Sequence, residues 1–131
     1  MAKRRAALFT VIFVFLCAFP FIAASQENKN VSTVTGEAFA DILKKDGIQI
    51  IDVRSAGEYE RGHIPGAVNM NVSDSGFSDR IKSLDKIKPL AVYCGSGGRS
   101  RKAVKIFSEN GFSEIYELKG GLPNWNGQIK K

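Results

Sequence analysis

Two dense apolar runs dominate the pattern of hydrophobic and polar positions along the chain, at residues 48–53 and 90–94. Neither run alternates between apolar and polar side chains, which indicates strands buried on both faces, as in a parallel sheet. Shorter apolar segments predict further strands over residues 31–34, 67–71 and 115–118. Because parallel neighbours need crossover connections, we expect helices between these strands.

Helical periodicity and residues that start or stop helices place those connections. Thr35 is a candidate N-cap for a helix over residues 36–45, and Gly111 is a candidate C′ residue for a helix over residues 100–110. We also expect a helix over residues 77–84, and turns over residues 57–66, which are rich in Gly and Pro, and around residues 122–126. The alternation of strands and helices predicts a three-layer α/β/α fold with a mainly parallel central sheet.

The N-terminal segment has the layout of a targeting sequence. Three cations (Lys3, Arg4 and Arg5) precede an almost unbroken apolar run over residues 6–24, and small residues end it just before Gln26. This layout predicts a signal peptide over residues 1–25, with cleavage before Gln26 and a periplasmic or secreted location. The alternative is an uncleaved anchor, since the run approaches the roughly 20 residues that span a bilayer. Only such a leader would bring the chain to a membrane.

Removing the leader changes the charge and cysteine counts. The chain has 131 residues, is 44% hydrophobic and 24% charged, and carries a formal net charge of +6, of which three positive charges belong to the leader. The remaining basicity fits a solvated surface, with no interleaved aromatic and basic stripe that would indicate nucleic-acid binding. We expect residues 26–30 to be a flexible lead-in and residues 31–131 to form one monomeric domain.

A single thiol, Cys94, remains after the leader and its Cys17 are removed. A lone exported cysteine is either buried and inert or exposed and chemically used. With one further candidate ligand, His63, it does not make a convincing metal site, so we expect no metal and no cofactor.

The residues around Cys94 favour chemical use. Asp52 and Cys94 each close a buried run, so both are expected at the carboxyl edge of the sheet, where open α/β folds bind ligands. Gly95, Ser96, Gly97 and Gly98 then lead into a helix. Such a loop can turn successive N–H groups inward at a helix N-terminus, which favours thiolate over thiol.

Basic residues occupy the first turns of the helix that follows, where acidic residues would suit the helix dipole. They are Arg99, Arg101, Lys102 and Lys105. Broken local rules often mark functional sites, although a solvated basic face explains Lys102 and Lys105 equally well.

The order and spacing of several motifs resemble a single-domain rhodanese, in an exported form, over nearly the whole segment from residue 31 to residue 126. These motifs are Ile51-Asp52-Val53-Arg54, Glu58-Tyr59, Gly62-His63-Ile64-Pro65-Gly66-Ala67-Val68-Asn69, the C-x-x-G-x-R loop from Cys94 to Arg99, and Gly120-Gly121 with Trp125. The resemblance implies a sulfurtransferase that carries a sulfane sulfur as a Cys94 persulfide. The donor would be a small anion such as thiosulfate and the acceptor cyanide or a thiol. The loop residues Gly95, Ser96, Gly97 and Gly98 would bind the donor together with Arg99, which completes the loop.

The resemblance also implies roles for other residues and leaves alternatives open. Asp52 and Arg54 are expected to pin the loop, His63 to make a structural hydrogen bond rather than act as a base, and Trp125 to anchor packing. Four residues separate Cys94 from Arg99, against five in related phosphatases, which argues against phosphate hydrolysis. The loop carries no charge between them, so thiosulfate could stand in for a native persulfide donor. The rival function is a non-enzymatic sulfur carrier or protein-interaction module.

Overall fold

The computed structural model describes residues 30–131. The predicted signal peptide over residues 1–25 and all but the last residue of the lead-in lie outside the described residues. None of the helices within residues 30–131 has the length and apolar character needed to cross a membrane.

Five strands form one sheet in the order β1-β5-β4-β2-β3, and every neighbouring pair is parallel. The strands are β1 (Val31–Val34), β2 (Gln49–Asp52), β3 (Val68–Asn69), β4 (Leu90–Tyr93) and β5 (Ile115–Leu118). The central strand β4 is buried along its whole length, as its continuous apolar run predicts. The expected parallel α/β sheet is therefore confirmed.

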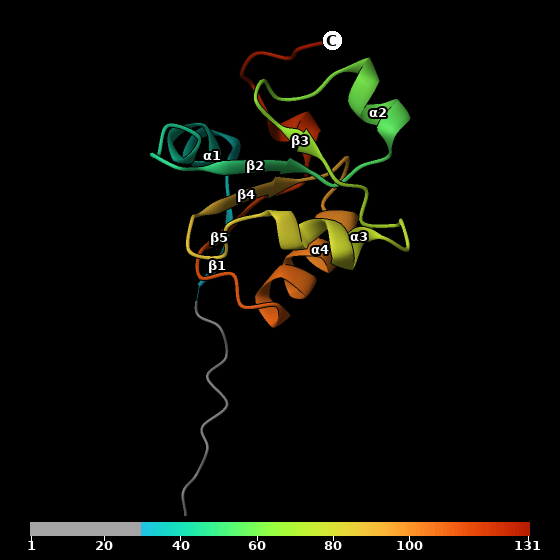
Figure 1. The fold of residues 1–131 in the computed structure, drawn as a ribbon. Coiled ribbons are helices and arrows are strands. Elements are labelled where there is room, and N and C mark those ends of the chain that lie inside the picture. Colours follow the sequence, from blue (N-terminus) through green and yellow to red (C-terminus); the bar gives the residue numbers. More distant parts are fainter. Residues whose placement is uncertain (1–29) are drawn as a thin grey trace, which may run out of the picture.

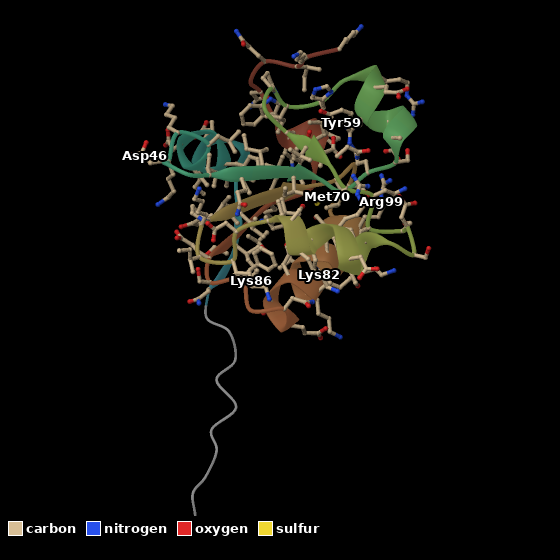
Figure 2. All side chains as sticks on the ribbon, viewed as in Figure 1. Asp46, Tyr59, Met70, Lys82, Lys86 and Arg99 are labelled. Carbon is tan, nitrogen blue, oxygen red and sulfur yellow. The ribbon has the colours of Figure 1, made fainter. Side chains whose placement is uncertain are left out.

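Helices cover both faces of this sheet (Figure 1). They are α1 (Gly36–Ile42), α2 (Ala56–Arg61), α3 (Phe77–Arg80), α4 (Gly98–Glu109) and the short 3-10 helices η1 (Ile81–Ser83) and η2 (Leu122–Asn124). Phe77, Phe107 and Phe112 pack edge to face beneath one side of the sheet, and Phe39 packs against Tyr93 and Trp125 on the other. Tyr59 and Lys82 lie on opposite sides of the sheet (Figure 2).

The segment expected to contain only turns includes the helix α2, so that prediction is wrong. The Ser55 hydroxyl accepts the Glu58 N–H at 3.3 Å and donates to the Glu58 carboxylate at 3.0 Å. This exchange resembles a capping box, which satisfies donors that a helix start otherwise leaves unpaired. Gly57 weakens helix propensity, but the cap outweighs that weakness and the helix ends at Gly62.

Other predicted elements are present with shorter or divided bounds. The helix expected over residues 77–84 is divided into α3 and η1, and the strand expected over residues 67–71 has only two residues. The helix α4 begins at Gly98, two residues before the expected start, because Gly97 supplies the turn into it.

Candidate active site

The carboxyl ends of β2 and β4 bring the first candidate residues together. Asp52 pairs in register with Tyr93, so Cys94 follows directly beside the end of β2. Gly95, Ser96 and Gly97 then connect Cys94 to α4. The expected meeting of Asp52 and Cys94 at one edge of the sheet is confirmed.

Two glycines allow the loop to close on the sulfur. Gly97 has φ 100°, which other residues rarely adopt, and in this conformation its N–H donates to the Cys94 Sγ at 2.9 Å. Gly121 has φ 75° and lies so close that an added Cβ would be 2.6 Å from the Cys94 carbonyl oxygen. The Gly120-Gly121 motif therefore forms part of the wall of the loop, although it is distant in sequence.

The environment of the thiol shifts its ionisation in two opposing directions. Burial acts to raise the pKa of the Cys94 thiol, but the neighbouring Ser100 and the N–H groups of Ser96 and Gly97 act to lower it. The net pKa of Cys94 lies below its ordinary value. The thiolate, which is the nucleophilic form, is thus favoured by the ring of donors expected from the loop glycines.

Cys94 has no exposed surface. The expectation that a chemically used thiol would be exposed is therefore wrong for this conformation. The loop folds around the sulfur, and a distant segment closes against the loop backbone, with Gly121 in close contact and the Leu122 N–H bonded to the Cys94 carbonyl at 2.8 Å. A reagent reaches this sulfur only after a local movement of the loop or its cover.

The Arg99 side chain pairs with Glu58 at the edge of the loop. Its Nη1 and Nη2 donate to the two carboxylate oxygens of Glu58 at 2.6 and 2.9 Å. The pair lies against Gly95, where an added Cβ would be 2.8 Å from the Arg99 Nη2. The hydrogen bond from Arg99, with a smaller contribution from Ser55, lowers the pKa of Glu58 to about 2 against the opposing effect of burial. Figure 2 labels Arg99 at this edge.

Asp52 and Arg54 form a second, more deeply buried pair. Arg54 donates through Nε and Nη2 to the Asp52 carboxylate, at distances of 2.6–3.1 Å, and through Nη2 to the Gly62 carbonyl at 2.7 Å. Removing one partner of such a pair leaves an uncompensated buried charge. The bonds of this pair fix the segment after α2 to the end of β2, and they hold the Arg54 side chain beside the loop, 4.0 Å from where a Gly95 Cβ would lie.

His63 and Trp125 have structural contacts. The His63 Nδ1 donates to the Tyr59 carbonyl at 2.9 Å, and its ring stacks on Tyr59 with centroids 3.7 Å apart. The Trp125 ring packs edge to face on Phe39, and its Nε1–H donates to the Gln128 carbonyl. The structural hydrogen bond expected for His63 and the packing role expected for Trp125 are both confirmed.

A buried carboxylate that the sequence analysis did not single out lies behind the loop. Glu117, on β5, accepts a hydrogen bond from the Ser100 hydroxyl at 2.7 Å and one from Thr33 at 3.2 Å. Ser100 also contacts the Gly97 carbonyl, so one hydroxyl connects Glu117 with the cysteine loop. The sequence signal for this site was a charged residue, Glu117, at a buried position of the last strand. Its partner Ser100 is 17 residues away in the chain, so the sequence did not connect the two.

The remaining candidates lie at the surface. Gly98, Arg101, Lys102 and Lys105 are exposed along α4, as the solvated-face interpretation of the basic residues expects. Within residues 30–131, no group of three or more His, Cys, Asp or Glu side chains is placed to hold a metal ion.

The fold and site define a class: a parallel α/β domain with a cysteine in a short glycine-rich loop before a helix. The chain belongs to the rhodanese-like family, because residues 35–128 match the model of the Rhodanese-like domain. It is 36% identical over 122 residues to "Uncharacterized protein YqhL" of Bacillus subtilis, covering 92% of this chain and 94% of that protein.

Relatives with a named activity and solved structures agree with this family. The chain is 35% identical over 83 residues to "Thiosulfate sulfurtransferase GlpE" of Pseudomonas paraeruginosa, covering 63% of this chain and 74% of that protein. A rhodanese-like domain from Anabaena superposes with a TM-score of 0.67 at 30% identity, covering 78% of this chain and 79% of that one. A rhodanese-like protein from Staphylococcus aureus superposes with a TM-score of 0.66 at 26% identity, covering 76% and 96%.

Proposed function

We propose that this chain is an exported sulfurtransferase that carries sulfur as a persulfide on Cys94. The observation that carries the proposal is the Gly97 N–H bonded to the Cys94 sulfur at 2.9 Å, within a loop that lowers the pKa of the thiol. The similarity to named thiosulfate sulfurtransferases supports the same chemistry.

In the first half-reaction the Cys94 thiolate attacks the outer sulfur of thiosulfate. A bond forms between the cysteine sulfur and that outer sulfur, the bond to the sulfonate group breaks, and sulfite leaves with the bonding electron pair. Negative charge then rests on the outer sulfur of the persulfide. The N–H groups of Ser96, Gly97 and Ser100 are the donors that stabilise anionic sulfur in this loop.

In the second half-reaction an acceptor takes the outer sulfur. Cyanide attacks it to give thiocyanate, or a thiolate attacks it to give a new persulfide. In both cases the bond between the two sulfur atoms breaks, and its electron pair returns to Cys94 as thiolate. This is covalent catalysis in two steps, and it needs no separate base because the attacking group is already ionised.

In this proposal the Arg99 guanidinium exchanges its partner Glu58 for the anionic donor. Its pairing with Glu58 neutralises the guanidinium in the resting conformation. An arriving dianion competes with Glu58 for that guanidinium, so donor binding breaks the pair. Because the pair is partly exposed, we expect it to contribute only about 1 kcal/mol, so little free energy opposes this exchange.

The cellular setting is also part of the proposal. The basic residues and apolar run before Gln26 support export as a signal peptide, with Cys94 acting in the periplasm or outside the cell. The uncharged residues between Cys94 and Arg99 favour a persulfide as the native donor, with thiosulfate as its substitute. The domain is proposed to act as a monomer, with no cofactor.

Intact-mass measurement tests the intermediate directly. The protein from Gln26 onward is incubated with thiosulfate, freed of excess reagent and weighed beside the Cys94→Ser variant. A gain of one sulfur atom is expected in the first protein and not in the second. An unchanged mass in both would refute sulfur transfer from this donor.

A non-enzymatic sulfur carrier is the second candidate, and the complete burial of Cys94 favours it. A carrier would hold the persulfide away from small acceptors until a partner opened the loop. Steady-state production of thiocyanate from thiosulfate and cyanide separates the two functions, because an enzyme turns over repeatedly and a carrier gives at most one equivalent. Hydrolysis of a small aryl phosphate is expected to be absent in either case.

A further inference from the structure

A groove of about 380 Å³ runs beside the cysteine loop, between α2 and the C-terminal segment. Three of its lining residues lie against the loop: the Leu122 N–H donates to the Cys94 carbonyl, and the Glu58 and Arg54 side chains reach within 3.5 and 4.0 Å of where a Gly95 Cβ would lie. A molecule that reacts with Cys94 therefore has this groove beside the loop that it must approach.

The groove has one uncompensated positive charge. Arg54 is paired with Asp52, and Glu58 is paired with Arg99. Arg61, at the end of α2, is exposed, and no carboxylate within residues 30–131 forms an ion pair with it. The groove thus presents a free guanidinium, a group that binds carboxylates in a planar fork.

The part of the lining that comes from the C-terminal segment is apolar. It is formed by Leu122, the Trp125 ring and Ile129, whose side chain remains 45% exposed. This part is held in place because the backbone N–H and carbonyl of Lys130 pair with those of His63, at 2.8 and 3.0 Å. Exposed apolar surface in the same groove as a single unpaired cation matches a ligand with an apolar chain and one anionic end.

We propose that this groove binds the organic part of a thiol or persulfide that consists of an apolar chain ending in a carboxylate. The inference rests on the proposed function, since it names the class of sulfur acceptor or donor that the Cys94 persulfide serves. In the acceptor direction the organic thiolate attacks the outer sulfur of the persulfide and leaves as an organic persulfide, and Cys94 regains its electron pair as thiolate. Thiosulfate and cyanide lack the chain that would fill the groove.

The first test needs no sulfur transfer. Trp125 is the only tryptophan of the chain and lines the groove, so its fluorescence reports occupancy. Titration with hexanoate, hexanol and hexylamine is expected to give half-saturation at the lowest concentration for hexanoate. In Arg61→Gln the advantage of hexanoate over hexanol is expected to fall by about threefold, the size of a partly exposed ion pair. Equal responses to all three compounds would overturn the inference.

The second test uses turnover with three acceptors of equal length, mercaptohexanoate, mercaptohexanol and aminohexanethiol. The ratio of kcat/KM for the acid to that for the amine is expected to exceed one and to fall about threefold in Arg61→Gln. Ile129→Ser is expected to lower kcat/KM for the acid and the alcohol alike, without changing their ratio. Arg80→Gln, on α3 across the sheet, is the matched control and leaves all three values unchanged.

Cyanide turnover, measured beside these acceptors, separates the two proposals. Turnover with cyanide but no preference for the acid would refute the groove as an acceptor site and leave the sulfurtransferase intact. If the protein shows no turnover with any acceptor but binds hexanoate selectively, the enzymatic function is refuted and the groove remains a site for carboxylate-bearing chains.

Discussion

Arg99 is paired with Glu58, whose two carboxylate oxygens accept hydrogen bonds of 2.6 and 2.9 Å from the guanidinium. The two residues are 41 positions apart in the chain, on α2 and α4, so their pair connects two helices across the mouth of the loop. We expect this pair to influence both the pKa of the Cys94 thiol and the access of reagents to it, and the two effects can be measured separately.

Glu58→Gln and Arg99→Gln test that coupling. Each variant breaks the pair, so the plateau rate of Cys94 alkylation by iodoacetamide at high pH is expected to rise about two- to fivefold in both. The pKa of Cys94 is expected to fall in Glu58→Gln, where Arg99 remains as a free cation, and to rise in Arg99→Gln. The pH profile of alkylation gives both quantities, and shifts of the pKa in one common direction would contradict this account.

The Glu58 carboxylate also makes stability depend on pH. Its pKa is lowered from 4.5 to about 2 in the folded state, so its contribution to stability is complete above pH 4.5 and is lost as the pH falls towards 2. Because the pair is partly exposed, we expect a contribution of about 1 kcal/mol. Urea unfolding of the wild type and Glu58→Gln should differ by this amount at neutral pH and converge near pH 2. A difference independent of pH would assign the effect to packing.

Glu117 is expected to oppose ionisation of Cys94 through Ser100. Its carboxylate holds the Ser100 hydroxyl at 2.7 Å and brings a negative charge behind the loop. Glu117→Gln removes that charge and should lower the pKa of Cys94 further, read from the pH dependence of alkylation. Thr33→Val removes the other partner of Glu117 but keeps the charge, and should leave the thiol pKa unchanged. A shift in both variants would indicate a packing effect instead.

Gly121 and Gly111 form a matched pair for testing the wall of the loop. Both have positive φ, 75° and 85°, but an added Cβ meets the backbone of the cysteine loop at position 121 and nothing within 4 Å at position 111. Gly111→Ala should cost about 1 kcal/mol of stability from backbone conformation alone. Gly121→Ala should cost about 1–3 kcal/mol more and change Cys94 reactivity. If both variants lost the same free energy of unfolding in urea, the loop would have moved away from the added Cβ at position 121 with little cost.

The parallel sheet and the cysteine loop could be predicted because their signals are local. An uninterrupted apolar run such as Leu90–Tyr93 indicates a central strand by itself, and glycines after a buried strand indicate a turn into a helix. The position of Cys94 at the carboxyl edge follows from these two signals together. The stacked, hydrogen-bonded His63 likewise follows from its place in a turn.

The burial of Cys94 and the partners of Arg99 could not be predicted in the same way. Burial of the sulfur depends on Gly121 approaching the loop from another segment, and the Arg99 pair depends on α2, which was expected to be turns. The capping exchange between Ser55 and Glu58 was a local signal for that helix, but Gly57 obscured it. Contacts between distant segments follow only once every element is correctly placed.

The sheet order has a consequence for how the chain folds as it is made. β1 lies at an edge of the described sheet with β5 as its neighbour, so the first described strand has no partner until the last described strand has been made. Until Ile115–Leu118 emerge, an incomplete domain has an unpaired edge at β4. Native closure of the sheet therefore requires β5, and chains stopped short of β5 should remain sensitive to protease.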